Sequence, residues 1–567
     1  MARMLGAQMF FETLLHQGVD VVFGLPGGYV LKVYDIMTQY EGKIKHVLAR
    51  HEQAATHMAD GYARVSGKPG VVLCTSGPAA TNTVTGIATA QMDSSPILIF
   101  TGQVPTQYLG SDAFQEADHI GITMPCTKHN YLVRKTVDLP TAMVEAFHIA
   151  TTGRPGPVLV DMPKDVLIGE DELIIPKEIS LRGYKPNLKG NPSQIKKAVD
   201  LILKAERPII FCGGGVICAN ATSDLKKFVK KVQIPVCCTL MGLGAFPWDD
   251  PLYVNFLGMH GSYAANMAIH ESDLVISIGA RFDDRATGGK FDEFAPKANI
   301  IHIDIDPATI DKNIHVHCPI VGDAKVVINQ LLEALPAKIK TDRKKWLSQI
   351  KEWDTKHPLL PNKNDHRIKT TFVIDLLSKL TKGDAIIVSD VGQHQMWLAQ
   401  FYKFKKPRTW INSGGLGTMG FSLPAAMGAK FGAPDELVIC VCGDGSFQMN
   451  FQELATAVEN KMDLKIIVFN NGHHGMVRQW QTMFFNSNYS ASKFGVLPDF
   501  VKLAEAFGAK GLKAARPDEL EPTLKELLST DGVVLMEIVV DHEEMVYPMI
   551  SPGGAMNDMI LQPVDVA

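Results

Sequence analysis

The sequence predicts an α/β protein with three consecutive domains, each built on a doubly wound parallel sheet. The chain has 567 residues, which is too long for one hydrophobic core and suggests about three domains of ~150 residues. Hydrophobic residues make up 46% of it and charged residues 20%, as in globular proteins. Short apolar runs alternate with helical patterns along the chain, and strands separated by helices form parallel sheets with helices on both faces.

The first domain is expected to span residues 1–170. It begins with a segment of helical periodicity (Met4, Ala7, Phe11, Leu14, Leu15), which has none of the features of a signal peptide. Its expected strands lie in the segments VVFGLPGG, KHVLARHEQAA, GVVLCTSGP, PILIFTGQV and GPVLVDMP. The polar, proline-containing segment PKEISLRGYKPNLKGNPSQ then predicts a linker.

Two further domains are expected at residues 190–340 and 365–540. Strands of the second lie in RPIIFCGGG, IPVCCTL, LVISIGARF and NIIHIDID, and the third runs from AIIVSD to GVVLMEIVVD. Between them, TDRKKWLSQIKEWDTKHPLLPNKNDH predicts a helix followed by a loop. The tail, residues 541–567, is rich in Met, Gly and Pro and is expected to be a docking segment or a lid.

Composition excludes several classes of function. The net charge of −4 gives no reason to expect binding to nucleic acid or to an anionic membrane. No run of ~18 apolar residues occurs, so no membrane span is expected. Most of the nine cysteines lie in apolar runs, and no CxxC pair has zinc-ligand spacing. They therefore indicate buried thiols in a reducing compartment, and the expected localisation is cytoplasmic.

The chemically most informative stretch runs from Gly443 to Asn471. An apolar strand ends at Gly443-Asp444-Gly445, a helical segment follows, and a second apolar run ends at Asn470-Asn471. The carboxyl ends of parallel strands meet at one sheet edge, so Asp444 and Asn471 are expected to be neighbours. Their oxygens suit Mg²⁺, which binds few protein ligands together with diphosphate oxygens. Gly-Asp-Gly alone would also suit an ordinary turn.

This arrangement resembles the thiamine diphosphate (ThDP) motif. A larger ordered set of segments resembles the catalytic subunits of acetohydroxyacid synthases (acetolactate synthases) over nearly the whole chain. The segments are FGLPGG, RHEQAA, TSGPAATN, TGQVP, DAFQE, KHNYLV, GRPGPVLVDMPKD, LGMHG, GARFDDR, HIDIDP, GQHQMW, GGLGTMGF and NNGHHGMVRQW. His474 stands where the family commonly has Leu, Ala79 where it has Gly, and Gln107 where a basic residue is frequent. These departures concern substrate preference and inhibitor response more than reaction type.

The resemblance implies a pyrimidine-binding first domain, a central FAD-binding domain and a diphosphate-binding third domain. Glu52 would contact N1′ of the ThDP aminopyrimidine, a carboxylate at a helix start being the alternative. Met419 would support the bent coenzyme, where core packing is the alternative. The residues implied to contact ThDP are Glu52, Val391, Gly392, Gln393, His394, Gly417, Met419, Gly443, Gly445, Ser446 and Met476, with Val391 to His394 in a loop after a strand. Those implied to hold Mg²⁺ are Asp444, Asn471 and the His473 carbonyl.

FAD, bound without a net redox role, is implied for the central domain. Gly213-Gly214-Gly215 after one strand and Asp304 at the end of another suit an adenine dinucleotide lying across strand ends, although a glycine turn alone is weak evidence. The residues implied to contact FAD are Arg154, Gly214, Thr239, Leu240, Met259, His260, Gly279, Arg281, Asp283, Asp304, Ile305 and Asp323.

The substrates implied are 2-ketoacids. Arg285 would hold the carboxylate of the acceptor ketoacid bidentately, with a salt bridge to Asp283 or Asp284 as the alternative. The implied pocket residues are Phe114, Lys164, Arg285, Met476 and Trp480, and the implied catalytic residues are Glu52, Gln115, Lys164, Arg285 and Met419. If their segment is helical, Met476 and Trp480 share one helix face, which either a pocket wall or ordinary core would explain.

The implied function is condensation of two pyruvates to 2-acetolactate with loss of CO₂, and of pyruvate with 2-ketobutyrate, in branched-chain amino acid biosynthesis. The rivals are a flavin-dependent pyruvate oxidase, another ThDP carboligase, and a non-catalytic paralogue. The resemblance also implies a homodimer or tetramer with active sites between subunits, and a separate regulatory subunit.

Overall fold

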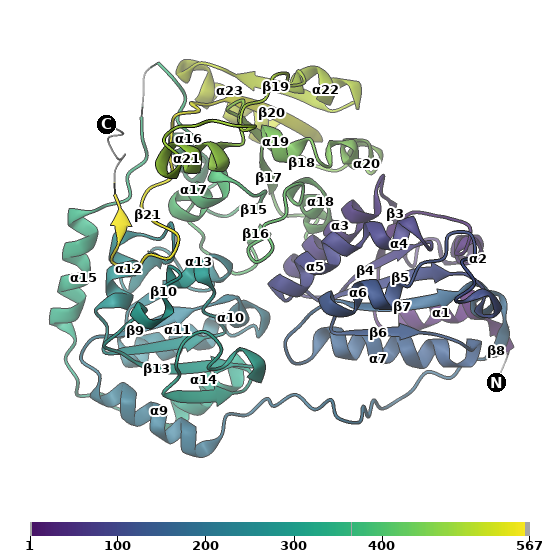
Figure 1. Ribbon diagram of the computed structural model, residues 1–567, viewed down its shortest axis with the longest axis horizontal. Helices are drawn as coiled ribbons and strands as arrows, with labels where there is room; N and C mark the ends of the chain where they lie inside the picture. The colour runs from purple at the N-terminus through teal and green to yellow at the C-terminus, as the bar shows by residue number, and fades with distance from the viewer. Residues whose placement is uncertain (1–2, 364–365, 562–567) are drawn as a thin grey trace.

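The computed structural model describes residues 3–363 and 366–561. It contains three six-stranded sheets, and every pairing within them is parallel. Figure 1 shows the first sheet with its helices as one lobe, the central sheet beside the linker, and the third sheet above both. The predicted fold class is therefore confirmed.

The first sheet lies within residues 21–163. Its strands in spatial order are β3 (Lys45–Leu48), β2 (Val21–Gly24), β4 (Gly70–Cys74), β5 (Ile97–Gln103), β7 (Val158–Pro163) and β6 (His129–Leu132). Its helices are α1 (Gly6–His16), α2 (Leu31–Met37), α3 (Glu52–Ser66), α4 (Pro78–Asn82), α5 (Val84–Asp93), α6 (His119–Thr123), α7 (Leu139–Thr151) and α8 (Lys164–Ile168). A short antiparallel pair joins β1 (Arg3–Leu5) to β8 (Glu170–Glu172).

The central sheet follows the predicted linker, which Figure 1 shows as an extended segment. Its strands are β11 (Tyr253–Phe256), β10 (Val236–Cys238), β9 (Pro208–Cys212), β12 (Leu274–Ile278), β13 (Asn299–Asp304) and β14 (Cys318–Val321). Its helices are α9 (Pro192–Lys204), α10 (Gly214–Cys218), α11 (Thr222–Val232), α12 (Tyr263–His270), α13 (Asp284–Thr287) and α14 (Ala324–Ala334). Helix α15 (Lys344–Lys356) occupies the lysine-rich segment, where a helix followed by a loop was predicted.

The third sheet carries the Gly443–Asn471 stretch. Its strands are β16 (Trp410–Asn412), β15 (Ile386–Ser389), β17 (Val438–Gly443), β18 (Leu464–Asn470), β20 (Val533–Val539) and β19 (Lys510–Ala514). Its helices are α16 (Thr370–Leu380), α17 (Gln393–Phe401), α18 (Ser422–Gly432), α19 (Asp444–Phe447), α20 (Leu454–Glu459), α21 (Gly475–Phe484), α22 (Phe500–Ala506) and α23 (Pro517–Ser529).

Strand order divides the three sheets into two kinds. With strands numbered by chain position within each sheet, the first and third have the order 2-1-3-4-6-5, whereas the central sheet has 3-2-1-4-5-6. In each sheet the order reverses beside its first strand, and such a switch point opens a crevice at the carboxyl ends of the strands. Each domain therefore offers one natural ligand site.

In the three six-stranded sheets, the strands that sequence analysis did not identify all lie at sheet edges. They are β6, β11, β14, β16 and β19. Of these, β6 and β19 are mostly exposed or half-buried, and β16 has three residues. An edge strand is covered less than a central one, so its sequence needs no continuous apolar run.

The first and third domains pack together through α3 and α18, which lie side by side in Figure 1. Glycines permit the close approach. A Cβ on Gly61 would lie 2.0 Å from the Ala425 carbonyl oxygen, and one on Gly428 would lie 1.8 Å from that of Met58. Helix α3 begins at Glu52, where the ring of His51 accepts a hydrogen bond from the Gln53 amide.

The tail returns from the third domain to the central one. It forms a two-stranded antiparallel pair, β21 (Met549–Ile550) with β22 (Met559–Ile560). The Ile550 amide donates to the Met259 carbonyl at 2.8 Å, and Ile550 and Met556 are fully buried against the central core. Residues 562–567 of the predicted tail lie outside the described residues.

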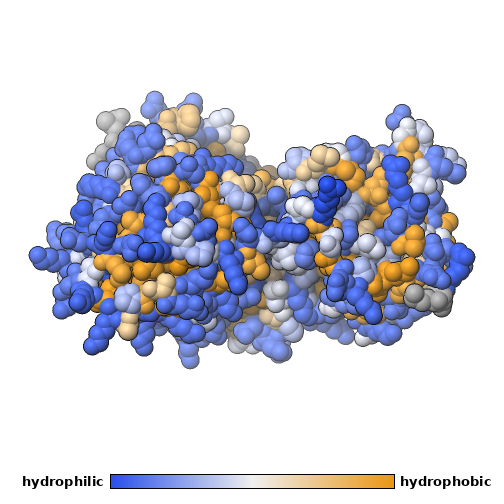
Figure 2. Space-filling view, turned by 90° about the horizontal axis from the view of Figure 1, so that it is seen from below, coloured by the Kyte–Doolittle hydropathy of each residue, from blue (hydrophilic) through white to orange (hydrophobic). Residues whose placement is uncertain are grey.

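Seen from below, the surface is hollowed between two lobes, with apolar side chains gathered in patches among polar ones (Figure 2). In the described part of the chain, no helix has the length and hydropathy to span a membrane.

Candidate active site

A cavity of about 1480 Å³ lies where the central and third domains meet, with part of the first domain along one side. It brings together most of the predicted site residues from distant parts of the sequence. Its lining includes all twelve residues predicted for FAD, all those predicted for ThDP except Glu52, the three predicted for Mg²⁺, and Arg285 and Trp480.

The Asp444 carboxylate lies at the edge formed by β17 and β18, which are paired in parallel. It is 2% exposed. Its Oδ1 accepts from the Gly445 amide at 2.8 Å and its Oδ2 from the Gly472 amide at 2.7 Å. Asn471 follows β18, so the predicted proximity of the two strand ends is confirmed. Each of these oxygens has a further lone pair, and Asp444 lines the cavity.

Burial raises the pKa of Asp444 to about 6, while hydrogen bonds from backbone amides lower it. A buried carboxylate with this pKa gains from a nearby cation. Among the described residues, no group of three or more His, Cys, Asp or Glu side chains could hold a metal ion. A divalent ion here would therefore depend on Asp444, Asn471, a backbone oxygen and ligand oxygens, which is the sparse donor set that suits Mg²⁺.

The segment after β15 is partly helical, so the prediction of a loop from Val391 to His394 was wrong for its second half. Gln393 and His394 form the first turn of α17, because Gly392 adopts φ 153° and lets the chain turn directly into the helix. Within the part of the chain that the structure describes, Nε2 of His394 is buried without a hydrogen-bond partner, and His394 lines the cavity. A diphosphate would supply the missing partner.

A glycine-rich loop, Ser413–Met419, contributes to the lining of the same cavity. Gly417 has φ 74°, which favours glycine, and only Val391 lies within 4 Å of the place of its missing Cβ. Thr418 donates its amide to Ser413 Oγ at 2.9 Å, which closes the loop. Gly417 and Met419 both line the cavity.

The central part of the cavity lies at the switch point between β9 and β12. Gly213, Gly215 and Gly279 meet there without room for side chains, since a Cβ on Gly213 would lie 2.0 Å from the Gly279 oxygen. Asp304 ends β13, and burial raises its pKa to about 6. Buried His302 lies 2.8 Å from the Ala280 carbonyl oxygen and holds the turn before Arg281.

Arg154 enters this part of the cavity from the first domain. Its Nε donates to Ser94 Oγ at 2.9 Å, and its Nη1 lies 3.3 Å from Asp306 Oδ2. Arg154 thus connects the two domains beside Asp304.

Arg285 and Trp480 both line the cavity and lie close to each other. The guanidinium carbon lies 5.9 Å from the indole ring centroid. The alternative salt bridge is long and exposed, with Arg285 Nε 3.8 Å from Asp284 Oδ2, and Asp283 instead caps α13 by accepting from the Ala286 amide. Met476 and Trp480 both lie on α21 and line the cavity, so the segment is helical, which is the condition for the two to share one helix face.

Four predicted residues of the first domain lie outside the cavity. Glu52 begins α3 and accepts a hydrogen bond from Asn82 Nδ2 at 2.9 Å. Phe114 is 81% exposed, Gln115 adopts φ 60°, and Lys164 is exposed at the start of α8. Within one chain, these residues are not brought together with Asp444.

His474, which departs from the family pattern, lies beside Gly445 and packs on the ring of Phe494 at 4.5 Å between centroids, so its ring contributes to the cavity wall. Two other residues of the site were not predicted from the sequence. Arg64 and Asp93, from the first domain, also line the cavity. No local pattern marks their contacts with the third domain, because Arg64 donates to the Asn412 carbonyl and Asp93 accepts from the Gly414 and Gly415 amides, all more than 300 residues away.

Comparisons with known proteins agree with this arrangement. Three family models match in order: thiamine pyrophosphate enzyme N-terminal TPP binding domain at residues 4–122, central domain at 195–331, and C-terminal TPP binding domain at 390–538. The acetolactate synthase large subunit of Buchnera aphidicola subsp. Schizaphis graminum is 50% identical, with 99% of each chain covered. Acetolactate synthase isozyme 3 large subunit of Escherichia coli K12 is 48% identical over 98% of each chain. The chain belongs to the acetolactate synthase large-subunit family.

The relationship extends across distant organisms. A probable acetolactate synthase large subunit of Methanocaldococcus jannaschii is 49% identical, covering 99% of this chain and 96% of the relative. Both TPP-binding domain matches support thiamine diphosphate as the cofactor of this family member. The resemblance inferred from sequence segments is thereby confirmed.

Proposed function

We propose that this chain is the catalytic subunit of an acetolactate synthase. It condenses two pyruvates to 2-acetolactate with loss of CO₂, and pyruvate with 2-ketobutyrate to 2-aceto-2-hydroxybutyrate, at the start of branched-chain amino acid biosynthesis. The observation that carries this proposal is identity near 50% to acetolactate synthase large subunits over almost the full length.

The chain holds thiamine diphosphate and Mg²⁺ in the third domain. When bound, the coenzyme supplies the carbanion chemistry for decarboxylation and carboligation. Asp444, Asn471 and the His473 carbonyl hold the metal, supported by the buried carboxylate and its remaining lone pairs. Gly443 donates its amide to Ser446 Oγ at 3.1 Å and leads into α19, whose start favours a diphosphate.

The remaining contacts orient the coenzyme. Gly392, Gly417, Gly445 and Ser446 approach it closely, and Val391, Gln393, His394, Met419 and Met476 surround it. Glu52 holds a proton at the aminopyrimidine nitrogen. Its carboxylate reaches that place from the first domain of a second subunit.

FAD occupies the central part of the cavity as an architectural cofactor. The 3-2-1-4-5-6 strand order supports this, since that order is the one in which dinucleotides lie across the switch point. Gly213, Gly215 and Gly279 pack closely and have no side chains, so a phosphate can approach the backbone there. Asp304 lies at the end of β13, where a carboxylate can bind the ribose of a dinucleotide. The contacts are those predicted from the sequence, from Arg154 to Asp323.

Arg285 binds the carboxylate of the acceptor ketoacid, and Trp480 forms a wall beside its alkyl group. The guanidinium lies near the indole, its Nη1 donates to Met259 Sδ at 3.0 Å, and its ion pair with Asp284 is long and exposed, so it is available to an incoming carboxylate. Phe114, Gln115 and Lys164 complete the pocket from the second subunit.

The active unit is a homodimer, or a tetramer of such dimers, because Glu52 and Asp444 do not share a cavity within one chain. Exposed apolar side chains on both domains concerned, Phe114 (81%), Met124 (63%) and Val496 (89%), suit such an interface. A separate regulatory subunit is expected from the designation of the relatives as large subunits. The site of action is the cytoplasm. In this proposal residues 1–170 bind the pyrimidine of ThDP, residues 190–340 bind FAD, and residues 365–540 bind the diphosphate. Residues 541–567 form the tail.

The test is incubation of the purified protein with pyruvate under anaerobic conditions, with and without added ThDP and Mg²⁺. Acetolactate should accumulate only when both are present, without net bleaching of the flavin absorbance. Stoichiometric flavin reduction without acetolactate would instead identify a pyruvate oxidase and reject the proposal.

A further inference from the structure

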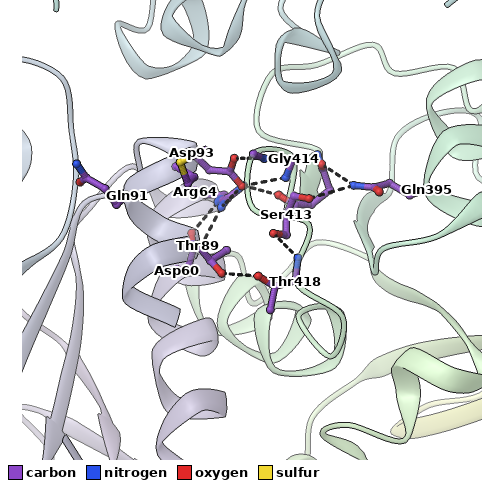
Figure 3. A network of polar contacts seen from close by, with 12 residues as sticks. Asp60, Arg64, Thr89, Gln91, Asp93, Gln395, Ser413, Gly414 and Thr418 are labelled. Carbon is purple, nitrogen blue, oxygen red and sulfur yellow. Dashed lines mark hydrogen bonds and ion pairs between the residues drawn. The ribbon is translucent and has the colours of Figure 1, made fainter. Parts of the chain in front are cut away.

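A buried ionic cluster joins the first domain to the glycine-rich loop (Figure 3). Arg64 on α3 donates to both oxygens of Asp60, at 2.6 and 2.9 Å, and to Asp93 Oδ2 at 3.1 Å. The side chains of both aspartates are 0% exposed and that of Arg64 is 11% exposed. Burying three charges is costly even when they are paired, so stability alone is a weak reason for such a cluster.

The two aspartates differ in one respect. Asp93 also accepts hydrogen bonds from backbone amides of the third domain, from Gly414 to Oδ2 at 3.0 Å and from Gly415 to Oδ1 at 2.7 Å. Asp60 has hydrogen bonds only to Arg64 among the described residues. Hydrogen bonds from amides to a buried carboxylate are stronger than those between neutral groups. Asp93 therefore fixes a turn that Asp60 does not touch.

Helix α5 holds this loop at both ends. Asp93 holds Gly414 and Gly415, and Thr89 lies one turn earlier, with its Oγ1 2.7 Å from Thr418 Oγ1. Residues four apart lie on the same helix face. Gly415 approaches α5 too closely for a side chain, because a Cβ there would lie 2.9 Å from Asp93 Oδ1 and from Met92 Cβ.

We propose that Asp93 is a positioning residue for the coenzyme. By fixing the Gly414–Gly415 backbone, it sets how far Gly417 and Met419 project into the cavity, and it acts through the loop rather than by touching the reacting atoms. This role rests on the proposed ThDP site. In this proposal the first domain contributes to two sites. Its Glu52 contacts the coenzyme bound by the second subunit, and its Asp93 positions the glycine-rich loop of its own chain.

The cluster supplies its own matched control. Asp93→Asn and Asp60→Asn remove the same charge from the same partner, but only the first removes an acceptor from the loop amides, because a carboxamide has one oxygen. In hydrogen–deuterium exchange of the full-length protein without added ThDP, a peptide covering Gly414–Met419 should exchange roughly tenfold faster or more in D93N. The same peptide in D60N should exchange near the wild-type rate, although D60N loses the same charge pairing.

A second readout is ThDP binding in the presence of Mg²⁺, followed by intrinsic fluorescence. Half-saturation should need several-fold more ThDP in D93N and the wild-type concentration in D60N. If D93N does not fold, Asp93→Glu replaces it, since it keeps the charge beside Arg64 while displacing the carboxylate from the two amides. Equal loop exchange in wild type, D60N and the folded Asp93 variant would overturn the proposal. Failure of the wild type to form acetolactate would reject the proposed function instead, and it would leave the exchange comparison readable.

Discussion

At the residue scale, buried histidines make the protein sensitive to mild acid. Burial lowers the pKa values of His57, His260, His302 and His394 to about 4 each. In the unfolded chain these values return to about 6.5. Because the folded pKa is the lower one, the unfolded state binds more protons below pH 6.5. The stabilisation from neutral histidines is therefore complete above pH 6.5 and is lost as the pH falls toward 4.

His302→Gln should reduce this sensitivity. Glutamine can donate to the Ala280 carbonyl as His302 does, but it does not titrate. Between pH 6.5 and 5.5 the free energy of unfolding should fall by about 1 kcal/mol less in the variant than in the wild type. Urea unfolding followed by circular dichroism at the two pH values measures this. An identical fall in both proteins would contradict the neutral state assigned to His302.

Trp480→Leu should weaken the preference for 2-ketobutyrate over pyruvate as acceptor. One methylene in an apolar pocket is worth roughly 1–3 kcal/mol, so the ratio of the two products should fall by about tenfold or more. Competition between the two ketoacids measures the ratio. Phe484→Leu is the matched control, since Phe484 packs on Trp480 at 5.6 Å between centroids but does not line the cavity. A similar fall of the product ratio in both variants would mean that the effect comes from altered packing of α21, not from the pocket wall.

At the element scale, the crossing of α3 and α18 determines where Glu52 and the glycine-rich loop lie. Both features lie close to these helices, since Glu52 begins α3 and Ser413–Met419 immediately precedes α18. The crossing tolerates only glycine at its centre, because the helix backbones almost touch. Local changes there are expected to affect both halves of the site.

Gly428→Ala should be strongly destabilising. The new Cβ would lie 1.8 Å from the Met58 carbonyl oxygen, so the helices must separate, and overpacking of this kind costs about 1–3 kcal/mol or more. The midpoint temperature of thermal unfolding should be clearly lower than that of the wild type. In Gly432→Ala, on the same helix, the nearest atom would lie 3.1 Å away, and the loss should be much smaller. Equal unfolding temperatures for the two variants would argue against the tight crossing.

At the scale of the whole molecule, one chain does not bring together all residues of the proposed site. The residues proposed for Mg²⁺ and FAD share one cavity with Arg285, whereas Glu52, Phe114, Gln115 and Lys164 lie elsewhere on the first domain. In the proposed dimer, symmetric association of two chains would supply these four residues to both sites, since each surface patch is used by both partners.

Two inactive variants should therefore complement each other. Glu52→Gln and Asp444→Asn should each abolish acetolactate formation as homodimers. A heterodimer of the two, co-expressed with different affinity tags and purified through both, keeps one site with native Glu52 and Asp444. It should show about half of the wild-type rate per dimer. If both residues served the same site within one chain, every site would carry a substitution and the heterodimer would be inactive.

The sequence by itself determined the fold class, the central strands and the membership of the family. These properties depend on short stretches of sequence. Continuous apolar runs indicate buried parallel strands, and Gly-Asp-Gly with Asn-Asn indicates two strand ends that lie side by side in a parallel sheet. All but four of the site residues that sequence analysis named line one cavity, because each stands in a short segment with its own chemistry.

Only the tertiary structure decided most of the edge strands, the helical start at Gln393, and the close crossing at Gly61 and Gly428. It also decided the role of Asp93, whose loop partners are more than 300 positions away. Edge strands need little apolar sequence, and the contacts of a buried charge depend on the domain that packs against it. Such contacts leave no pattern in the neighbouring residues, since they exist only after the domains have come together.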